Sequence, residues 1–250
     1  MKIPEWQDRT ELLLGDGALK TLAGAHVLVA GLGGVGAYAA EILCRAGVVK
    51  LSIVDGDKVQ PSNRNRQLIA LKSTEGKDKV HLMAERLLDI NPGIRLEVIN
   101  TLLNEETIDK LLETQFDYVA DAIDTLNPKV LLILKTMEKT YPLVSSMGSG
   151  GKLDPSLIMA VDISESYNCR LAYFIRKQLH RNNIRSGFKV VFSPEPVSKK
   201  TIKLITGERN KKSTVGTISY MPAIFGCYMA SVVIRDLLHK KKLPDICGNS

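Results

Sequence analysis

A glycine-rich turn, GLGGVG at residues 31–36, constrains this chain more than any other feature of its sequence. The turn directly follows an apolar run at residues 27–30 and precedes a stretch with helical periodicity, as in a nucleotide-binding strand–turn–helix unit. Gly31 would permit the tight turn, Gly33 would let the backbone approach a phosphate, and Gly36 would allow close packing of helix on strand. The free N–H groups at the start of the helix attract anions. The turn therefore predicts a Rossmann-like nucleotide site.

Apolar runs alternate with helix-period stretches from residue 27 to about residue 146, which is typical of strand–helix units in a parallel sheet. We predict strands at Val27–Ala30, Lys50–Asp55, Leu96–Asn100, Asp117–Ile123 and Leu143–Ser146. We predict helices near Val35–Ala46, Lys77–Ile90, Glu105–Glu113 and Pro128–Lys139, with Asn127 as the N-cap of the last helix and Pro128 at its first position. The predicted fold class is α/β, a Rossmann-like, doubly wound, mostly parallel sheet with a C-terminal α+β extension.

The turn-rich sequence that follows Ser146 ends this regular alternation. We expect residues 1–150 to form the nucleotide-binding half, and residues 151–250 to form an extension of the same compact domain. The extension is predicted to contain strands near Leu157–Ile163, Phe188–Phe192 and Thr201–Ile205, a helix near Arg170–His180, and a long helix from Pro222 to about His239. The uncharged run 213–234 is long enough to cross a bilayer, but its glycine, serine and proline residues favour a buried helix and no membrane association.

Charge is distributed unevenly along the chain. Residues 1–169 carry 18 Lys and Arg against 23 Asp and Glu, whereas residues 170–213 carry 12 against 2. The second segment therefore holds most of the positive charge of a chain whose formal net charge is +7. Such a run of charged residues is usually a solvated surface. Here, however, the positive charge is concentrated beside an acidic half, which favours a polyanionic partner such as tRNA.

The second predicted strand ends at Asp55, nineteen residues after Gly36, where a carboxylate can accept hydrogen bonds from both ribose hydroxyls. An NAD-dependent oxidoreductase would fit these residues equally well. The residues that follow favour a triphosphate, because an arginine can hold phosphate bidentately and a lysine can hold it as a point charge. The side chains on which this prediction of ATP depends are Asn63, Arg64, Arg66, Gln67 and Lys79.

Two further carboxylates have competing interpretations. Asp124 follows the fourth predicted strand, at the carboxyl edge where open parallel sheets bind ligands, and it would suit Mg²⁺ bridging phosphates. It could instead cap the next helix. Asp57, in Asp-Gly-Asp, is either part of the nucleotide site or an ordinary turn residue.

These motifs together resemble the superfamily of ubiquitin-activating, molybdopterin-synthase-activating and thiamine-sulfur-carrier adenylating enzymes. The shared features are Gly-x-Gly-Gly-x-Gly, Asp55-x-Asp57, Ser62-Asn63-x-x-Arg66-Gln67, Lys79 and Asp124. The resemblance implies that Gly31, Gly33, Gly34, Gly36, Asp55, Asp57, Asn63, Arg66, Gln67 and Lys79 bind ATP, with Asp124 on the metal. It also implies a homodimer in which an N-terminal arginine, which Arg9 resembles, reaches the partner's site. Arg66, Lys79, Asp124 and Arg9 are the implied catalytic residues.

Within this superfamily the chain most resembles the tRNA threonylcarbamoyladenosine dehydratases. The residues that carry this likeness are Arg-Thr-Glu-Leu-Leu-Leu-Gly, Asn-Arg-Gln, Met-Ala-Glu-Arg-Leu-Leu-Asp-Ile-Asn-Pro, Asp-Ala-Ile-Asp and Gly-Lys-Leu-Asp-Pro. The resemblance implies a cytoplasmic enzyme that uses ATP to activate the carboxylate of the modified adenosine as an acyl-adenylate and then closes a ring. Arg64 departs from the family pattern, which has an uncharged residue at that position.

Other functions remain open at this stage. The four cysteines form no Cys-x-x-Cys pair, and we find neither the thioester cysteine of the sulfur-relay branches nor their zinc cysteines. Adenylation of a ubiquitin-like sulfur-carrier protein is nevertheless an alternative within the same enzyme class. An NAD-dependent oxidoreductase and a nucleotide sensor without catalysis are alternatives from other classes.

Overall fold

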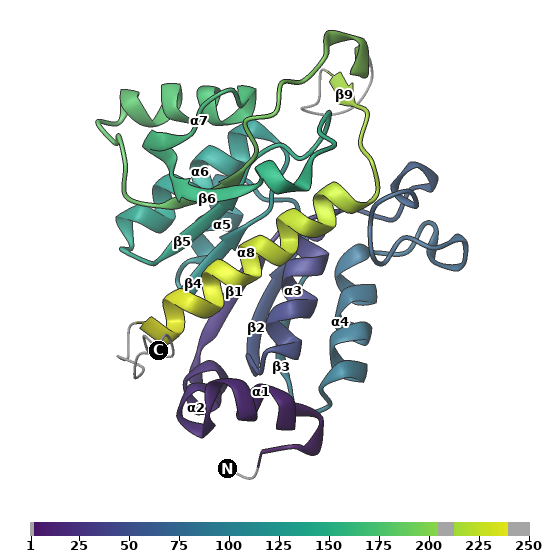
Figure 1. The fold of residues 1–250 in the computed structure, drawn as a ribbon, viewed down its shortest axis with the longest axis vertical. Coiled ribbons are helices and arrows are strands. Elements are labelled where there is room, and N and C mark those ends of the chain that lie inside the picture. Colours follow the sequence, from purple (N-terminus) through teal and green to yellow (C-terminus); the bar gives the residue numbers. More distant parts are fainter. Residues whose placement is uncertain (1–2, 205–212, 240–250) are drawn as a thin grey trace.

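The computed structural model describes residues 3–204 and 213–239 of the chain (Figure 1). Its centre is a seven-stranded sheet in the order β3-β2-β1-β4-β5-β7-β6. The strands are β1 (His26–Ala30), β2 (Lys50–Val54), β3 (Arg95–Ile99), β4 (Tyr118–Asp121), β5 (Leu143–Ser146), β6 (Met159–Asp162) and β7 (Lys189–Phe192). All neighbouring strands run parallel except β6, which pairs antiparallel with β7. The doubly wound, mostly parallel α/β fold is therefore confirmed.

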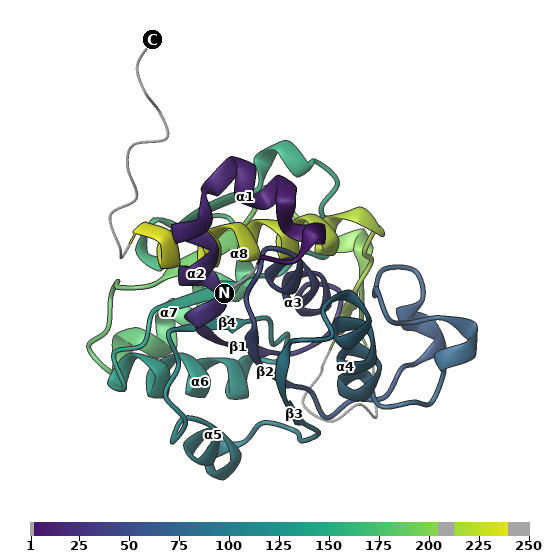
Figure 2. The same ribbon diagram turned by 90° about the horizontal axis from the view of Figure 1, so that it is seen from below.

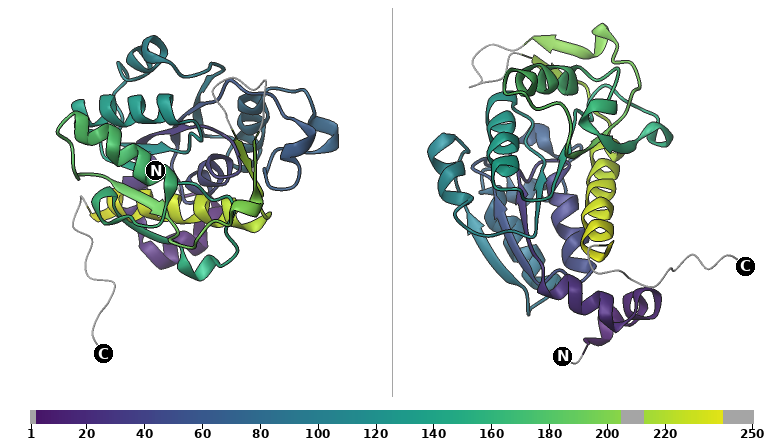
Figure 3. Two further views of the ribbon diagram at one scale, coloured as in Figure 1. Left: turned by 90° about the horizontal axis from the view of Figure 1, so that it is seen from above. Right: turned by 90° about the vertical axis from the view of Figure 1, so that its left-hand side faces the viewer.

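Helices cover both faces of this sheet, as the two end views show (Figures 2 and 3). The α-helices are α1 (Asp8–Leu14), α2 (Asp16–Gly24), α3 (Gly36–Arg45), α4 (Lys79–Ile90), α5 (Glu105–Leu111), α6 (Leu126–Glu138), α7 (Arg170–Arg181) and α8 (Tyr220–His239). One core cluster lies between the sheet and α2, α3, α4 and α8, and a second lies between the sheet and α5, α6 and α7. Short 3₁₀ helices occupy Glu5–Gln7, Pro61–Asn63, Lys72–Thr74, Pro155–Leu157, Ile163–Glu165 and Lys199–Thr201.

Burial explains why the central strands are nearly continuous apolar runs. All five residues of β1 are buried, because helices cover both faces of the sheet there. The edge strand β3 has no fully buried residue. Because β1 to β5 and β7 run parallel, their carboxyl ends meet at one edge of the sheet, which we call the carboxyl edge.

Helix α8 is long and apolar enough to span a membrane by length and composition. In the structure it packs lengthwise against α3 and contacts β4 and β5, and ten of its residues are buried, including Phe225, Met229 and Val233 (Figure 1). The predicted buried helix is confirmed, although it begins at Tyr220 rather than at Pro222.

The structure also corrects the predicted start of the helix near Pro128. Helix α6 begins at Leu126 with Thr125 as its N-cap, so Asn127 is not the cap and Pro128 is the third helical residue. Proline is tolerated there because the first turn of a helix leaves its N–H groups without intrahelical partners.

Several elements were not predicted from the sequence. These are helices α1 and α2, which precede the first predicted strand, and β9 (Ser213–Val215). Strand β9 pairs with β8 (Ile202–Leu204), which corresponds to the strand predicted near Thr201–Ile205. The last residue of the predicted strand at 201–205 lies outside the described residues, as do three basic residues (Arg209, Lys211 and Lys212) and Cys247. The other three cysteines are free thiols.

Candidate functional site

The glycine turn lies at the carboxyl edge, between the end of β1 and the start of α3. Gly31 has a φ of +88°, and a Cβ atom at Gly36 would lie 1.7 Å from the carbonyl oxygen of Gly31. Both positions therefore require glycine, as predicted. At Gly33 the nearest atom to an added Cβ is Nε2 of Gln67, at 3.9 Å. The backbone at Gly33 thus leaves the open space that a phosphate group would need.

The turn at residues 61–67 lies directly against the glycine turn. A Cβ atom at Gly34 would lie 3.5 Å from Cγ of Arg66 and 2.9 Å from Cβ of Pro222, near the start of α8. The Oε1 atom of Gln67 is buried and has no hydrogen-bond partner among the described residues. A buried polar atom without a partner is costly unless something fills that role, and a bound nucleotide would do so here.

Asp55 ties the second strand to the glycine turn. Its Oδ2 accepts a hydrogen bond from the Leu32 N–H at 2.6 Å, and its Oδ1 accepts one from the Asp57 N–H at 2.7 Å. Burial raises the pKa of Asp55, while nearby Lys79 and these two hydrogen bonds oppose the rise. A carboxylate has about four acceptor sites, so Asp55 can hold the turn and still accept ribose hydroxyls.

Lys79 begins α4 and points back toward the end of β2. Its side chain is only 6% exposed, and its Nζ lies 3.0 Å from Oδ2 of Asp57. The backbone N–H of Lys79 also donates to the Asp57 carbonyl at 3.0 Å. Asp57 is thus more than an ordinary turn residue, because it fixes the direction of a buried ammonium group that sequence reasoning assigned to phosphate binding.

Asn63 and the two arginines of the 61–67 turn have local partners. Asn63 is buried, and its Oδ1 accepts the Gln60 N–H at 3.0 Å, which shapes the turn. Arg66 donates to the Ser62 carbonyl at 2.9 Å and to Asn65 Oδ1 at 2.8 Å, but it has no carboxylate partner within the described ranges. By contrast, Arg64 pairs with Glu75 at 2.9 Å. Arg64, which departs from the family pattern, therefore forms an ion pair within its own loop.

The segment after β4 also borders the glycine turn. A Cβ atom at Gly31 would lie 3.0 Å from the carbonyl oxygen of Ala122, and the exposed Asp124 follows two residues later. Residues 3–204 and 213–239 contain no cluster of three or more His, Cys, Asp or Glu side chains that could hold a metal by themselves. Mg²⁺ is commonly held by one or two carboxylates together with substrate phosphates and water, and Asp124 fits that arrangement.

A buried ion pair that sequence reasoning missed supports this segment. Lys129 and Asp121 are both fully buried, with 2.8 Å between Nζ and Oδ2. Lys129 also donates to the Ile123 carbonyl at 2.9 Å, and Ser145 donates to Asp121 at 2.7 Å. Two features of the sequence could have predicted this ion pair: an aspartate within an apolar strand and a lysine in the first turn of an apolar helix. The pair fixes the backbone from which Asp124 projects.

Arg9 is the one predicted site residue that the structure does not bring to this cluster. It lies on α1, at the end of the molecule opposite the carboxyl edge (Figures 1 and 3). The neighbouring Leu12 and Leu13 are 90% and 70% exposed. Arg9 can therefore act at a nucleotide only if it is supplied to the site of a second copy.

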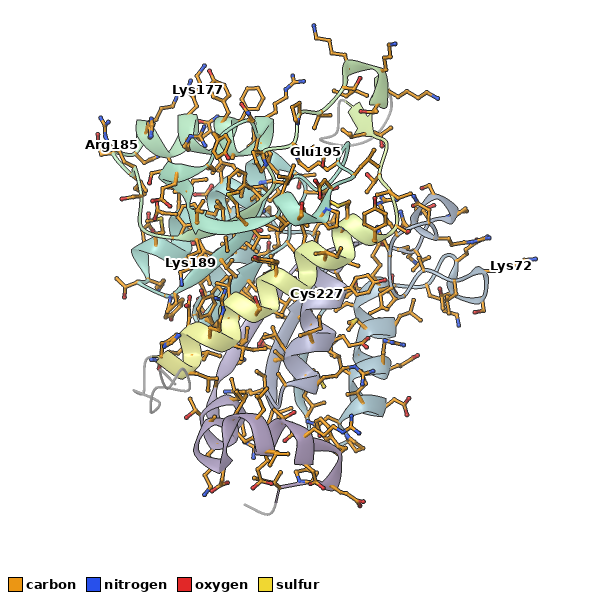
Figure 4. All side chains as sticks on the ribbon, in the orientation of Figure 1. Lys72, Lys177, Arg185, Lys189, Glu195 and Cys227 are labelled. Atoms are coloured by element: carbon orange, nitrogen blue, oxygen red, sulfur yellow. The ribbon has the colours of Figure 1, made fainter. Side chains whose placement is uncertain are left out.

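Most described basic residues of segment 170–213 lie on α7, on the following loop and near the β8–β9 ribbon, while Lys189 begins β7. Figure 4 shows Lys177 and Arg185 projecting from the outer surface around α7, while Lys72 projects from the opposite flank of the molecule. The basic segment is therefore a surface feature, separate from the buried groups of the glycine-turn site.

The whole chain is similar to several known proteins. A tRNA threonylcarbamoyladenosine dehydratase from Bacillus subtilis is 37% identical over 237 residues, which covers 92% of this chain and 93% of that protein. The crystal structure of the Escherichia coli tRNA N6-threonylcarbamoyladenosine dehydratase in complex with ATP superposes with a TM-score of 0.86 at 31% identity, covering 96% of this chain and 98% of that one. An Escherichia coli molybdopterin-synthase adenylyltransferase is 34% identical, but over only 50% of this chain.

The sequence profile of the ThiF family matches residues 8–249, a range that includes both the glycine-turn site and the basic segment. This match covers nearly the whole chain, and the Bacillus subtilis and Escherichia coli relatives that align over more than nine-tenths of it are both named tRNA threonylcarbamoyladenosine dehydratase. The chain belongs to the ThiF family.

Proposed function

We propose that this protein uses ATP to dehydrate N6-threonylcarbamoyladenosine in tRNA. The observation that supports this most directly is the Asp55-centred cluster, in which a half-buried carboxylate holds the glycine turn while Arg66, Gln67 and Lys79 surround the same space. Relatives that match more than nine-tenths of the chain are named for this activity, and one solved structure contains ATP. The similarity to the molybdopterin-synthase adenylyltransferase covers only half of the chain. This shorter match disfavours the sulfur-carrier alternative.

In the proposed reaction, the substrate carboxylate attacks the α-phosphorus of ATP and pyrophosphate leaves. The ureido group of the same modification then displaces AMP, loses a proton and closes the ring, so that water is removed overall. In this scheme Asp55 holds the ribose, and the N–H groups after Gly33 face the phosphates. Arg66 and Lys79 bind the negative charge that develops during the displacement.

Asp124 would hold Mg²⁺ against the phosphates, because it projects at the carboxyl edge from a segment that the Asp121–Lys129 pair fixes. Bound Mg²⁺ supplies electrostatic stabilisation of the phosphate oxygens. Within the chain, residues 1–150 would activate the carboxylate, and residues 151–250 would position the RNA. The free thiols and the tRNA substrate of the relatives support a cytoplasmic location.

We further propose a homodimer in which Arg9 serves the partner's site. Leu12 and Leu13 give α1 an exposed apolar surface beside Arg9, and such a surface is suited to association. A complementation experiment tests this assignment. When Arg9→Ala and Arg66→Ala proteins are mixed under conditions that exchange subunits, one intact site should form per heterodimer and activity should return. If the mixture stays as inactive as its components, the assignment of Arg9 is wrong.

The proposed function is tested by incubating the purified protein with ATP and tRNA that carries threonylcarbamoyladenosine. We expect AMP and pyrophosphate only when the modified tRNA is present, together with a loss of 18 mass units from the modified nucleoside, the mass of one water. AMP formation that depends on a Gly-Gly-ended carrier protein instead would favour the sulfur-carrier alternative. ATP binding without AMP formation under either condition would indicate a nucleotide sensor.

A further inference from the structure

Helix α7 has two faces of opposite character. Ala172, Ile175 and Leu179 are buried in the second core cluster. The exposed positions on the other face include Arg170, Tyr173, Lys177 and Arg181, which follow one another at intervals of three or four residues. The helix contains no acidic residue. We call these four residues the α7 face; it is cationic and has one aromatic side chain in its middle.

A hollow of about 330 Å³ lies at the start of this helix, lined by Asn168, Cys169, Arg170, Tyr173 and Arg176. Arg176 is held in place by the Ser166 carbonyl at 2.7 Å and by the Ser166 hydroxyl. Neither arginine forms an ion pair with any carboxylate among the described residues. Two guanidinium groups without carboxylate partners, facing one hollow, are suited to an anionic ligand.

The aromatic side chains at this hollow are arranged for stacking. Tyr173 is 54% exposed, and its ring packs edge-on against Phe174 with centroids 5.4 Å apart. The Arg170 guanidinium lies 5.6 Å from the centre of the Phe174 ring. The outer side of Tyr173 thus lies between Arg170 and Lys177 along the helix. An exposed ring flanked by cations is the surface on which single-stranded nucleic acids stack a base and place the neighbouring phosphates.

The hollow also lies near the nucleotide end of the molecule. Tyr167, just before it, packs edge-on against Phe192, with ring centroids 5.7 Å apart. Phe192 is the last residue of β7, and β7 runs parallel to β5, so this contact is at the carboxyl edge. An RNA bound here would therefore lie at the same edge of the sheet as the glycine turn.

The burial of α7 distinguishes between possible occupants. A basic amphipathic helix that binds membranes inserts its apolar face into the lipid, but the apolar face of α7 is already buried in the protein core. An acidic protein would satisfy the cations but would leave the exposed tyrosine without a specific role. An RNA duplex would offer phosphates but no unstacked base. Unpaired RNA satisfies both features.

We propose that the α7 face and Arg176 together bind unpaired nucleotides of the RNA substrate, with a base stacked on Tyr173 and the adjacent phosphates held by Arg170, Arg176 and Lys177. This inference rests on the proposed function and specifies which surface, and which form of RNA, the protein recognises. It also divides the work between the two halves of the chain, because none of these residues belongs to the glycine-turn site.

The test measures binding of the full chain to labelled tRNA and to a labelled 12-nucleotide single-stranded RNA by fluorescence anisotropy. Tyr173→Ala should weaken both affinities by about 5- to 150-fold, the effect of losing one stacked base. Tyr173→Phe should retain the affinity, because the ring remains. Tyr228→Ala is the matched control, since Tyr228 is also exposed but lies on α8. Unchanged thermal melting and ATP binding in all three variants would separate an RNA effect from a folding effect.

The charges are tested by the salt dependence of the same binding. Each phosphate contact to single-stranded RNA contributes about 0.7 to the slope of log affinity against log salt. Lys177→Gln should therefore reduce the slope by about 0.7, whereas Lys72→Gln, on the opposite flank in Figure 4, should leave it unchanged. Equal losses from both substitutions would overturn the assignment to the α7 face.

The two proposals fail in different ways. If the wild-type protein makes no AMP with modified tRNA, the proposed function fails. If it makes AMP but Tyr173→Ala binds and turns over RNA like the wild type, only the inference about α7 fails. The inference about α7 would also be overturned if duplex RNA or polyglutamate competed for binding as well as single-stranded RNA does.

Discussion

The two edges of the central sheet both contain buried polar side chains, but they use them differently. We call the opposite edge, where the parallel strands begin, the amino edge. There, the Nε2 of His26 lies 2.8 Å from the Ser52 hydroxyl, which donates to Glu97 at 2.5 Å. The His26 ring packs against Phe116, with centroids 4.7 Å apart. These contacts join β1, β2 and β3, although Nδ1 of His26 is buried and has no hydrogen-bond partner among the described residues.

At the carboxyl edge, the polar groups leave bonding capacity unused. Gln67 Oε1 has no partner among the described residues, and Gly33 faces open space. The backbone beneath them is held by Asp55 and by the Asp121–Lys129 pair. The comparison teaches that burial of polar groups alone does not indicate a binding site in this fold. An unpartnered polar atom alone does not indicate one either, because His26 Nδ1 at the amino edge also lacks a partner among the described residues. What distinguishes the carboxyl edge is the open space at Gly33 next to the Gln67 amide.

The largest expected effect comes from the carboxyl edge. Arg66→Ala should reduce AMP formation by about 10³-fold, because an arginine dedicated to transferring phosphate contributes on that scale. Arg64→Ala is the matched control, since Arg64 is two residues away and pairs with Glu75. Steady-state kinetics and far-ultraviolet circular dichroism would measure activity and fold. Near-normal turnover by Arg66→Ala would refute its proposed role.

The next effect is on stability. Lys129→Met should destabilise the protein by about 3–5 kcal/mol, because it leaves the Asp121 carboxylate buried without its counter-charge. The double variant Asp121→Asn/Lys129→Met removes that charge and should recover part of the loss. Urea unfolding measures both. A single variant as stable as the wild type would show that the pair does not hold the carboxyl edge.

Two glycine substitutions sharpen the comparison within one turn. Gly36→Ala should disrupt folding, because its methyl group would overlap the Gly31 carbonyl. Gly33→Ala should fold, since the protein leaves room for a methyl group there. A steric penalty of about 1–3 kcal/mol against the phosphates would weaken ATP binding by about 5- to 150-fold. Calorimetric titration that finds full ATP affinity in Gly33→Ala would place the phosphates elsewhere.

The smallest expected effect is on the pH dependence of stability, and it concerns His26 at the amino edge. Burial, followed by the nearby Lys50, lowers the pKa of His26 below its usual value. The unfolded chain therefore takes up a proton near pH 6.5 that the folded chain still excludes, so stability should fall as the pH drops below about 6.5. His26→Gln should flatten this dependence, whereas the exposed His81 provides the control substitution His81→Gln. An NMR titration in which His26 keeps its usual pKa would contradict the argument.

Much of the fold followed from short-range sequence patterns. The predicted strands β1 to β5 and helices α3 to α6 are all present, because their apolar periodicity reflects burial on one or both faces of the sheet. The start of α6 was placed wrongly because Asn-Pro is a good local cap signal, and the pairing of Lys129 with the distant Asp121 is invisible to local rules. Helices α1 and α2 and strand β9 were not predicted, because they are short elements without a strong hydrophobic period.

The sequence by itself determined the glycine turn, the identity of the residues around it and the segregation of positive charge, because spacing and composition are local properties of the chain. Only the tertiary structure decided that Lys79 is directed by Asp57, that Arg66 and Gln67 meet the glycine turn, and that Arg9 lies at the far end of the molecule. Those relations depend on how distant segments pack, and packing arises from the whole core rather than from any single motif.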